Sequence, residues 1–125
     1  MSAWHARRVT DQVDRLVDSW LSLSDVAHQL GASPNRVRQL IREHQLAAIR
    51  RAGGSEPSVP AEFLLDGEVI KGLGGTLTLL FDHGFSEVEA VEWLFTADDS
   101  LPGRPVDALR EDRGKEVRRR AQALV

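Results

Sequence analysis

The sequence predicts a mainly α-helical protein with one small β-hairpin. Three observations predict this fold class. Residues 23–43 contain two short amphipathic segments separated by a glycine and a Ser-Pro pair, residues 46–59 contain two extended segments around a double glycine, and residues 73–124 contain further helical patterns. We therefore expect a helix pair with a hairpin, followed by a small helical C-terminal domain.

Length and composition fit an ordinary globular protein. The chain has 125 residues, of which 42% are hydrophobic, enough for the core of one domain or of two very small ones. It has no cysteine, which excludes disulfides and thiolate metal sites. Because neither a signal-peptide core nor a membrane-spanning apolar run is present, we expect a soluble cytoplasmic protein with no membrane partner. The expected segments are a tail with an amphipathic helix (1–20), the helix pair with its hairpin (21–67) and the helical C-terminal domain (68–125).

Charge is distributed unevenly along the chain. The formal net charge is −3, yet residues 1–63 carry eight bases against seven acids, whereas residues 64–125 carry eight bases against twelve acids. Between Arg36 and Arg51, five arginines are opposed by Glu43 alone. A local basic patch on an acidic protein indicates an anionic partner that binds at one place, although such a cluster can also be a solvated helix face.

The helix pair is the best-defined pattern. Ser24 is positioned to cap a first helix, Gly31 to end it in the left-handed conformation, and Ser33 with Pro34 to cap and begin a second helix. Two short helices joined by such a turn form a helix-turn-helix in outline. In that motif the second helix reads DNA, so the exposed side of helix 34–43 is the candidate site.

The two sides of this second helix have different chemistry. Its aliphatic residues share one side and are expected to face the core: Val37, Leu40 and Ile41. At about 100° per residue, the opposite side carries groove-reading types, since Arg pairs with guanine edges, Asn or Gln pairs with adenine edges, and helix N-terminal amides hold phosphates. The candidate DNA-contacting residues are Ser33, Asn35, Arg36, Arg38, Gln39 and Arg42. Polar residues in these positions can also be ordinary surface residues.

A hairpin is expected directly after the helix pair. Extended segments at 46–51 and 56–60 flank the double glycine, and Pro57 is compatible with an edge strand. This hairpin, over residues 46–59, would form a wing whose tip reaches DNA phosphates or the minor groove. The candidate contact residues of the wing are Arg50, Arg51, Gly53 and Gly54. Pro60 is then expected to open a short helix over residues 61–65, which Asp66 and Gly67 end.

Residues 20–65 resemble the winged helix-turn-helix of MerR-like and excisionase-like proteins. The pattern is carried by Leu23-Ser24, by residues 26–31, by residues 37–41, by the basic segment 46–54 and by Val59-Pro60. Residues 21–125 are also similar to an actinobacterial family of winged-helix DNA-binding proteins linked to serine/threonine kinase signalling. That similarity lies in residues 50–54, 93–96, 104–109 and 119–123. It implies DNA binding. Together with the residues above, this leads us to expect a nucleoid-associated transcriptional regulator or architectural protein that binds double-stranded DNA, with helix 34–43 in the major groove and the wing on the backbone or minor groove.

The N-terminal segment is expected to form an amphipathic helix against the helix-turn-helix. Its apolar residues recur at helical spacing: Val9, Val13, Leu16, Val17 and Trp20. The run Arg7-Arg8-Val9-Thr10 also has the form of a site for a basophilic serine/threonine kinase, although a match this short also arises by chance. Phosphate on Thr10 would add negative charge near a DNA-binding surface and is expected to weaken binding.

The second half contains four further helical patterns. They begin between Leu73 and Thr76, at a capping box formed by Ser86 and Glu89, at Pro105 and at Gly114. The glycines after Lys71 do not form a nucleotide loop, because no Gly-Lys-Ser/Thr ending follows them. Asp98-Asp99 fits a turn better than a metal site.

Residues 76–122 suggest an alternative function. They resemble the C-terminal toxin-binding domain of Xre-type antitoxins at Gly84, Ser86, Ala90, Trp93-Leu94, Leu101, Arg104-Pro105, Asp107 and Leu109. Those antitoxins carry a wingless helix-turn-helix, so the alternative is an antitoxin-like or adaptor module that binds a protein partner.

The four histidines are isolated and no nucleophile motif is present, so we expect neither enzyme activity nor a cofactor or metal. The long dimerisation helix of MerR-like regulators is missing, which favours a monomer.

Overall fold

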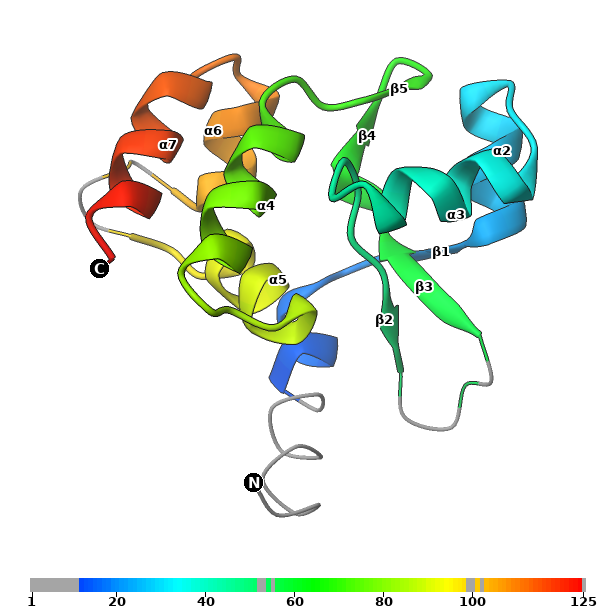
Figure 1. The fold of residues 1–125 in the computed structure, drawn as a ribbon, viewed down its shortest axis with the longest axis horizontal. Coiled ribbons are helices and arrows are strands. Elements are labelled where there is room, and N and C mark those ends of the chain that lie inside the picture. Colours follow the sequence, from blue (N-terminus) through cyan, green and yellow to red (C-terminus); the bar gives the residue numbers. More distant parts are fainter. Residues whose placement is uncertain (1–11, 52–53, 55, 99–100, 102, 125) are drawn as a thin grey trace.

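The computed structural model describes residues 12–51, 54, 56–98, 101 and 103–124. Two groups of elements lie on either side of a shared core, with the β2–β3 hairpin projecting from one of them (Figure 1). The first group comprises β1 (Trp20–Ser22), α2 (Leu23–Leu30), α3 (Pro34–Arg42), β2 (Ile49–Arg50) and β3 (Pro57–Pro60). The second comprises α4 (Leu73–Asp82), α5 (Glu87–Phe95), α6 (Pro105–Arg110) and α7 (Gly114–Gln122). The mainly α-helical fold with a small hairpin wing is therefore confirmed.

The helix-turn-helix consists of α2 and α3, and its caps are mostly those expected. Gly31 ends α2 at φ 66° and ψ 35°, and the Ser33 hydroxyl accepts a hydrogen bond from the Arg36 amide at 3.1 Å. The cap of α2 was predicted wrongly: Ser22, not Ser24, accepts from the Asp25 amide at 3.0 Å. The helix begins early because Leu23 then occupies its first turn and is buried beside Val26.

The hairpin of the wing belongs to a three-stranded antiparallel sheet in the order β1-β3-β2. The expected hairpin is present, since Ile49 pairs with Ser58 and Arg50 with Pro57. The third strand was not predicted. Trp20 lies in β1 and pairs with Pro60, whereas only residues 12–16 of the described N-terminal segment are helical. Helical spacing continued through Trp20 in the sequence, but pairing with β3 satisfies backbone groups that would otherwise lie on an open sheet edge.

A second correction concerns residues 61–67. The expected helix is only a 3-10 turn, η1 (Ala61–Phe63), followed by strands β4 (Leu64–Leu65) and β5 (Glu68–Val69). Asp66 and Gly67 have φ angles of 53° and 80°. Two consecutive positive φ angles are typical of a tight two-residue hairpin, so this pair turns the chain between strands and does not end a helix.

The four C-terminal helices begin close to the expected positions. Ser86 and Glu89 form the predicted capping box, with bonds of 2.9 and 3.1 Å. Asp98 lies in a β-bridge with Leu101, in agreement with a turn, whereas Asp99 lies outside the described residues. Within the described part of the chain, no helix is long and apolar enough to cross a membrane.

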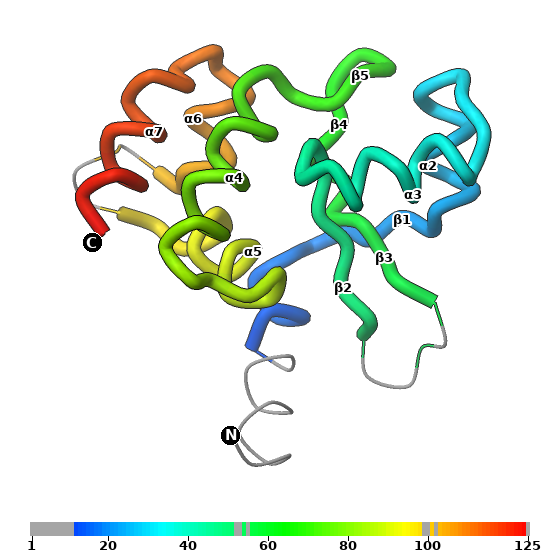
Figure 2. The backbone as a smooth tube through the Cα atoms, in the orientation of Figure 1, coloured from blue at the N-terminus to red at the C-terminus, as the bar shows by residue number. Residues whose placement is uncertain are grey.

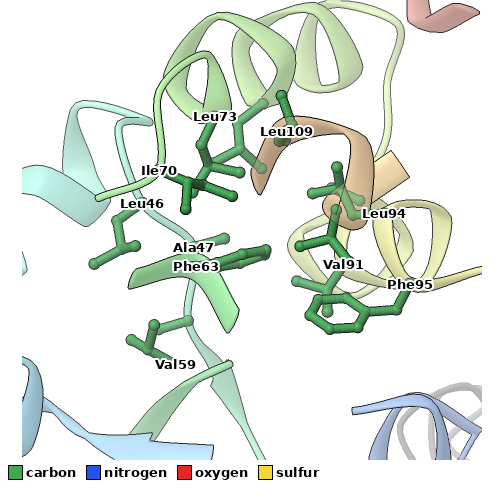
Figure 3. Close-up of a cluster of buried hydrophobic side chains, with 14 of the residues drawn as sticks. Leu46, Ala47, Val59, Phe63, Ile70, Leu73, Val91, Leu94, Phe95 and Leu109 are labelled. Carbon is green, nitrogen blue, oxygen red and sulfur yellow. The ribbon is translucent and has the colours of Figure 1, made fainter. Parts of the chain in front are cut away.

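The two groups of elements share one hydrophobic core. Phe63 is fully buried at the junction, and its ring centroid lies 5.6 Å from that of Phe95 in α5. Figure 3 shows the Phe63 ring pointing toward Val91, Leu94 and Phe95 across this junction. Polar bonds reinforce it, because Arg110 Nη1 donates to the carbonyls of Glu62 and Leu64 at 2.8 and 2.7 Å. The segment of residues 59–64, which follows the wing, is therefore held against the C-terminal helices.

At the same junction, Arg104 forms ion pairs with two carboxylates, Glu62 and Asp107. Arg104 Nη2 contacts Glu62 at 2.7 Å and Asp107 at 2.8 Å. The hydrogen bond from Arg104 lowers the pKa of Asp107 below its usual value of 3.8, while the pKa of Arg104 is raised. Both shifts favour the charged forms, so this pair stabilises the fold while Asp107 is ionised.

Candidate nucleic-acid interface

The outward face of α3 is polar and exposed. Val37 is fully buried, and Leu40 and Ile41 are half-buried against the core. The candidate residues on the other sides of the helix are exposed: Ser33, Asn35, Arg36, Arg38, Gln39 and Arg42. The core contacts of Val37, Leu40 and Ile41 thus orient α3 so that its polar side chains point to solvent.

Most of these side chains interact only with neighbours on the same helix. Arg38 Nη1 donates to Asn35 Oδ1 at 3.2 Å, and Gln39 Nε2 donates to Glu43 Oε2 at 3.0 Å. Arg36 Nη1 lies 3.9 Å from Glu43 Oε1. Exposed pairs of this kind contribute little stability, so base edges or phosphates can replace them at low cost. The side chain of Arg42 forms no hydrogen bond or ion pair with any described residue.

The two arginines of the wing have different environments. Arg50 is exposed at the end of β2. Arg51 Nε donates to Asp14 Oδ1 at 2.8 Å, and its guanidinium lies 5.1 Å from the centroid of the Trp20 ring. Arg50 is therefore available to an anion, whereas Arg51 is already engaged by an acid and by the face of an aromatic ring.

The tip of the wing is only partly described. Gly54 is exposed, and its amide donates to the carbonyl of Arg51 at 3.0 Å. Gly53 and Thr10, the candidate phosphosite, lie outside the described residues. Among the described residues, no group of three or more His, Asp or Glu side chains is arranged to hold a metal ion.

Comparison with known proteins identifies the family. A family model described as the wHTH domain of DNA-binding protein Rv2175c matches residues 9–64, and one described as the Rv2175c C-terminal domain of unknown function matches residues 70–125. "DNA-binding protein Rv2175c" of Mycobacterium tuberculosis (strain ATCC 25618 / H37Rv) is 43% identical over 115 residues, which cover 82% of this chain and 77% of the relative. This chain belongs to the Rv2175c family. The resemblance to an actinobacterial winged-helix family is thereby confirmed.

A solved structure supports the same assignment at the level of the fold. The NMR structure of Rv2175c matches with a TM-score of 0.77 and 41% identity, covering 85% of this chain and 80% of that chain. In this member of the Rv2175c family, residues 65–69 lie between the two family-model matches, in and around the β4–β5 hairpin. The helix-turn-helix with its wing lies in the first matched part, and the C-terminal helices lie in the second.

Proposed function

We propose that this protein is a DNA-binding transcriptional regulator that reads the major groove with α3 and contacts the backbone or minor groove with the wing. The exposed polar face of α3, held in place by the capped helix-turn-helix, carries this proposal. The name of its relative in M. tuberculosis, a DNA-binding protein, supports it. We propose a binding function without a catalytic step.

The chemistry of each side chain suggests its role on DNA. Arg42, Gln39 and Asn35 occupy the outward face and are the candidates for base-edge contacts, because their planar groups match the edges of guanine and adenine. Arg36 and Arg38 on the flanks are assigned to phosphates. Ser33 and the first amides of α3 are assigned to a phosphate at the start of the helix.

The wing contributes a separate set of contacts. Arg50 is assigned to a phosphate or the minor groove, with Arg51 as a weaker contributor because of its bond to Asp14. Gly53 and Gly54, which carry no side chain, are assigned to a close approach of the backbone to DNA. These contacts position α3 and carry little sequence information themselves.

Binding to labelled duplexes tests this function. A sequence selected from a random DNA pool is titrated with wild-type protein at several salt concentrations, alongside the Arg42→Ala variant and an Arg120→Ala control. Arg42→Ala is expected to weaken binding about tenfold and to relax the preference for one base pair, whereas the control binds like wild type. If the wild type binds no duplex at low salt, the proposed function is wrong.

Other roles remain predictions. Phosphorylation of Thr10 by a serine/threonine kinase, a protein partner for residues 76–122, a monomeric state and association with the nucleoid each follow from the sequence arguments above. The alternative antitoxin-like or adaptor function would act through the C-terminal helices. Capture of one stoichiometric partner by residues 76–122 of the full chain, together with absence of DNA binding, would favour it.

A further inference from the structure

A basic groove crosses the molecule from α3 to α7. It consists of two adjoining open cavities of about 530 and 570 Å³, which share Lys71 and Gly72. The first cavity is lined on one side by Arg36, Leu40 and Glu43 of α3, and the second is lined by Lys115, Arg118 and Arg119 of α7. Figure 2 shows the segment between β5 and α4, which contains Lys71, passing from the helix-turn-helix to the C-terminal helices.

The cations of this groove outnumber its available acids. The second cavity contains Asp112 and Glu116 as its acidic residues. Glu116 is paired with Arg113 at 3.2 Å, and Arg113 also contacts Glu111 at 2.8 Å. The remaining cations of this cavity form no ion pair with any described residue: Lys71, Lys115, Arg118 and Arg119. Three of these cations are exposed and Arg118 is half-buried, and Asp112 is their only unpaired acidic neighbour among the described residues of the cavity lining.

Glycines shape the floor of the groove. Arg118 Nη1 lies 3.3 and 3.6 Å from the positions that Cβ atoms would take at Gly114 and Gly72. A side chain at either position would therefore compete with the guanidinium for space. Gly74 similarly leaves room for the side-chain amide of Gln45, which a Cβ would meet directly. Gly72 and Gly114 thus leave room for the Arg118 guanidinium where the start of α4 lies beside the start of α7.

The side chains of α7 are divided between two directions. Arg120 Nη2 contacts Asp98 at 3.4 Å and does not line the groove, whereas Arg118 and Arg119 do. The arginine run of α7 thus lines a cavity in addition to placing favourable charge near the C-terminus of the helix. Two of its three members contribute to one surface together with Lys71, which lies more than forty residues earlier in the chain.

We propose that the C-terminal domain uses this groove to bind phosphates of the same DNA duplex that α3 contacts. The proposal rests on the proposed DNA-binding function. It is favoured by the continuity of the groove with the Arg36 flank of α3 and by its row of unpaired cations. Because the protein has a net charge of −3, a long polyanion gains attraction only where cations are locally concentrated. The groove therefore extends the DNA footprint beyond the helix-turn-helix and adds affinity without reading sequence.

Three variants of the full chain test this extension. The double variant Lys115→Ala/Arg119→Ala removes two exposed cations from the groove, and Arg120→Ala removes one cation of the same helix whose side chain lies elsewhere. Asp112→Asn removes the opposing acid. Asp112 has a φ of 61°, a conformation that asparagine tolerates well, so this substitution preserves the turn. Binding of each variant to the selected duplex is measured across a range of salt concentrations, with circular dichroism confirming the fold.

The variants are expected to change affinity in opposite directions. The double variant should weaken binding on the order of tenfold and lower the slope of log affinity against log salt by about 1 to 2, because each lost phosphate contact removes about 0.9. Asp112→Asn should strengthen binding about twofold, and Arg120→Ala should match wild type. Wild-type affinity and slope in a folded double variant would overturn the groove proposal while leaving DNA binding by α3 intact. Failure of the wild type to bind DNA would instead overturn the proposed function.

Discussion

The winged unit (residues 20–60) and the helical unit (residues 73–122) present their cations in different ways. In the winged unit the arginines follow one another on a single helix and hairpin, and most are exposed. In the helical unit the unpaired cations come from α7 and from Lys71, just before α4, and they form one groove although this half of the chain is acidic overall. The net charge of a segment therefore does not predict the charge of its surface, because ion pairing neutralises some charged groups and packing brings others together.

The two units have different surfaces but share one hydrophobic core, so substitution of Phe63 should lower the stability of both units together. Phe63→Ala removes a fully buried ring at the junction and is expected to cost about 3 to 5 kcal/mol of unfolding free energy. Urea denaturation, followed separately by the fluorescence of Trp20 and Trp93 in single-tryptophan variants, measures the effect. Both probes should shift to the same lower midpoint. A shift at one probe alone would show that the units unfold independently.

The polar bonds at the junction should have a smaller effect. Arg110→Ala removes the donor that binds the carbonyls of Glu62 and Leu64, and we expect a loss of about 1 to 3 kcal/mol. Arg119→Ala is a suitable control, since that exposed side chain makes no bond across the junction. Equal urea midpoints for the two variants would contradict a role for Arg110 in joining the units.

Acid should weaken the same junction through Asp107. Its pKa is lowered in the folded protein, chiefly by the hydrogen bond from Arg104, so its ionised form stabilises the fold above about pH 4, and this contribution is lost as the pH falls through the folded pKa. Asp107→Asn should therefore be less stable than wild type at neutral pH, with the difference shrinking below about pH 4. Urea midpoints at a series of pH values measure it, and a constant difference at all pH values would contradict the assignment.

Helix-capping residues and hydrophobic spacing predicted those parts of the molecule that depend on residues close together in the sequence. Ser33, Gly31 and the Ser86–Glu89 box act within a few residues of themselves, so the end of α2, the starts of α3 and α5 and the exposed face of α3 could be derived from local spacing. Strand β1 could not, because its pairing with β3 joins segments nearly forty residues apart. The basic groove was missed for the same reason. Lys71 and Arg118 are adjacent only after α4 packs against α7.

The contact between Asp14 and Arg51 is another feature that the sequence did not predict, since the two residues are 37 positions apart. The two arginines of the wing therefore differ in their contacts: Arg50 is available, whereas Arg51 is held by Asp14 and by the Trp20 ring. Arg50→Ala should therefore weaken DNA binding more than Arg51→Ala.

Asp14→Asn tests whether Asp14 holds Arg51 away from DNA, and it should change DNA affinity only slightly. It removes the charge that competes with DNA for Arg51 while keeping a similar shape, so we expect binding to strengthen about twofold, with a slightly steeper salt dependence. The pair is partly exposed, so its loss should change stability little. In the Arg51→Ala background, Asp14→Asn should have a smaller effect on affinity. An equal gain in both backgrounds would mean that Asp14 acts only by general repulsion of DNA and not by holding Arg51.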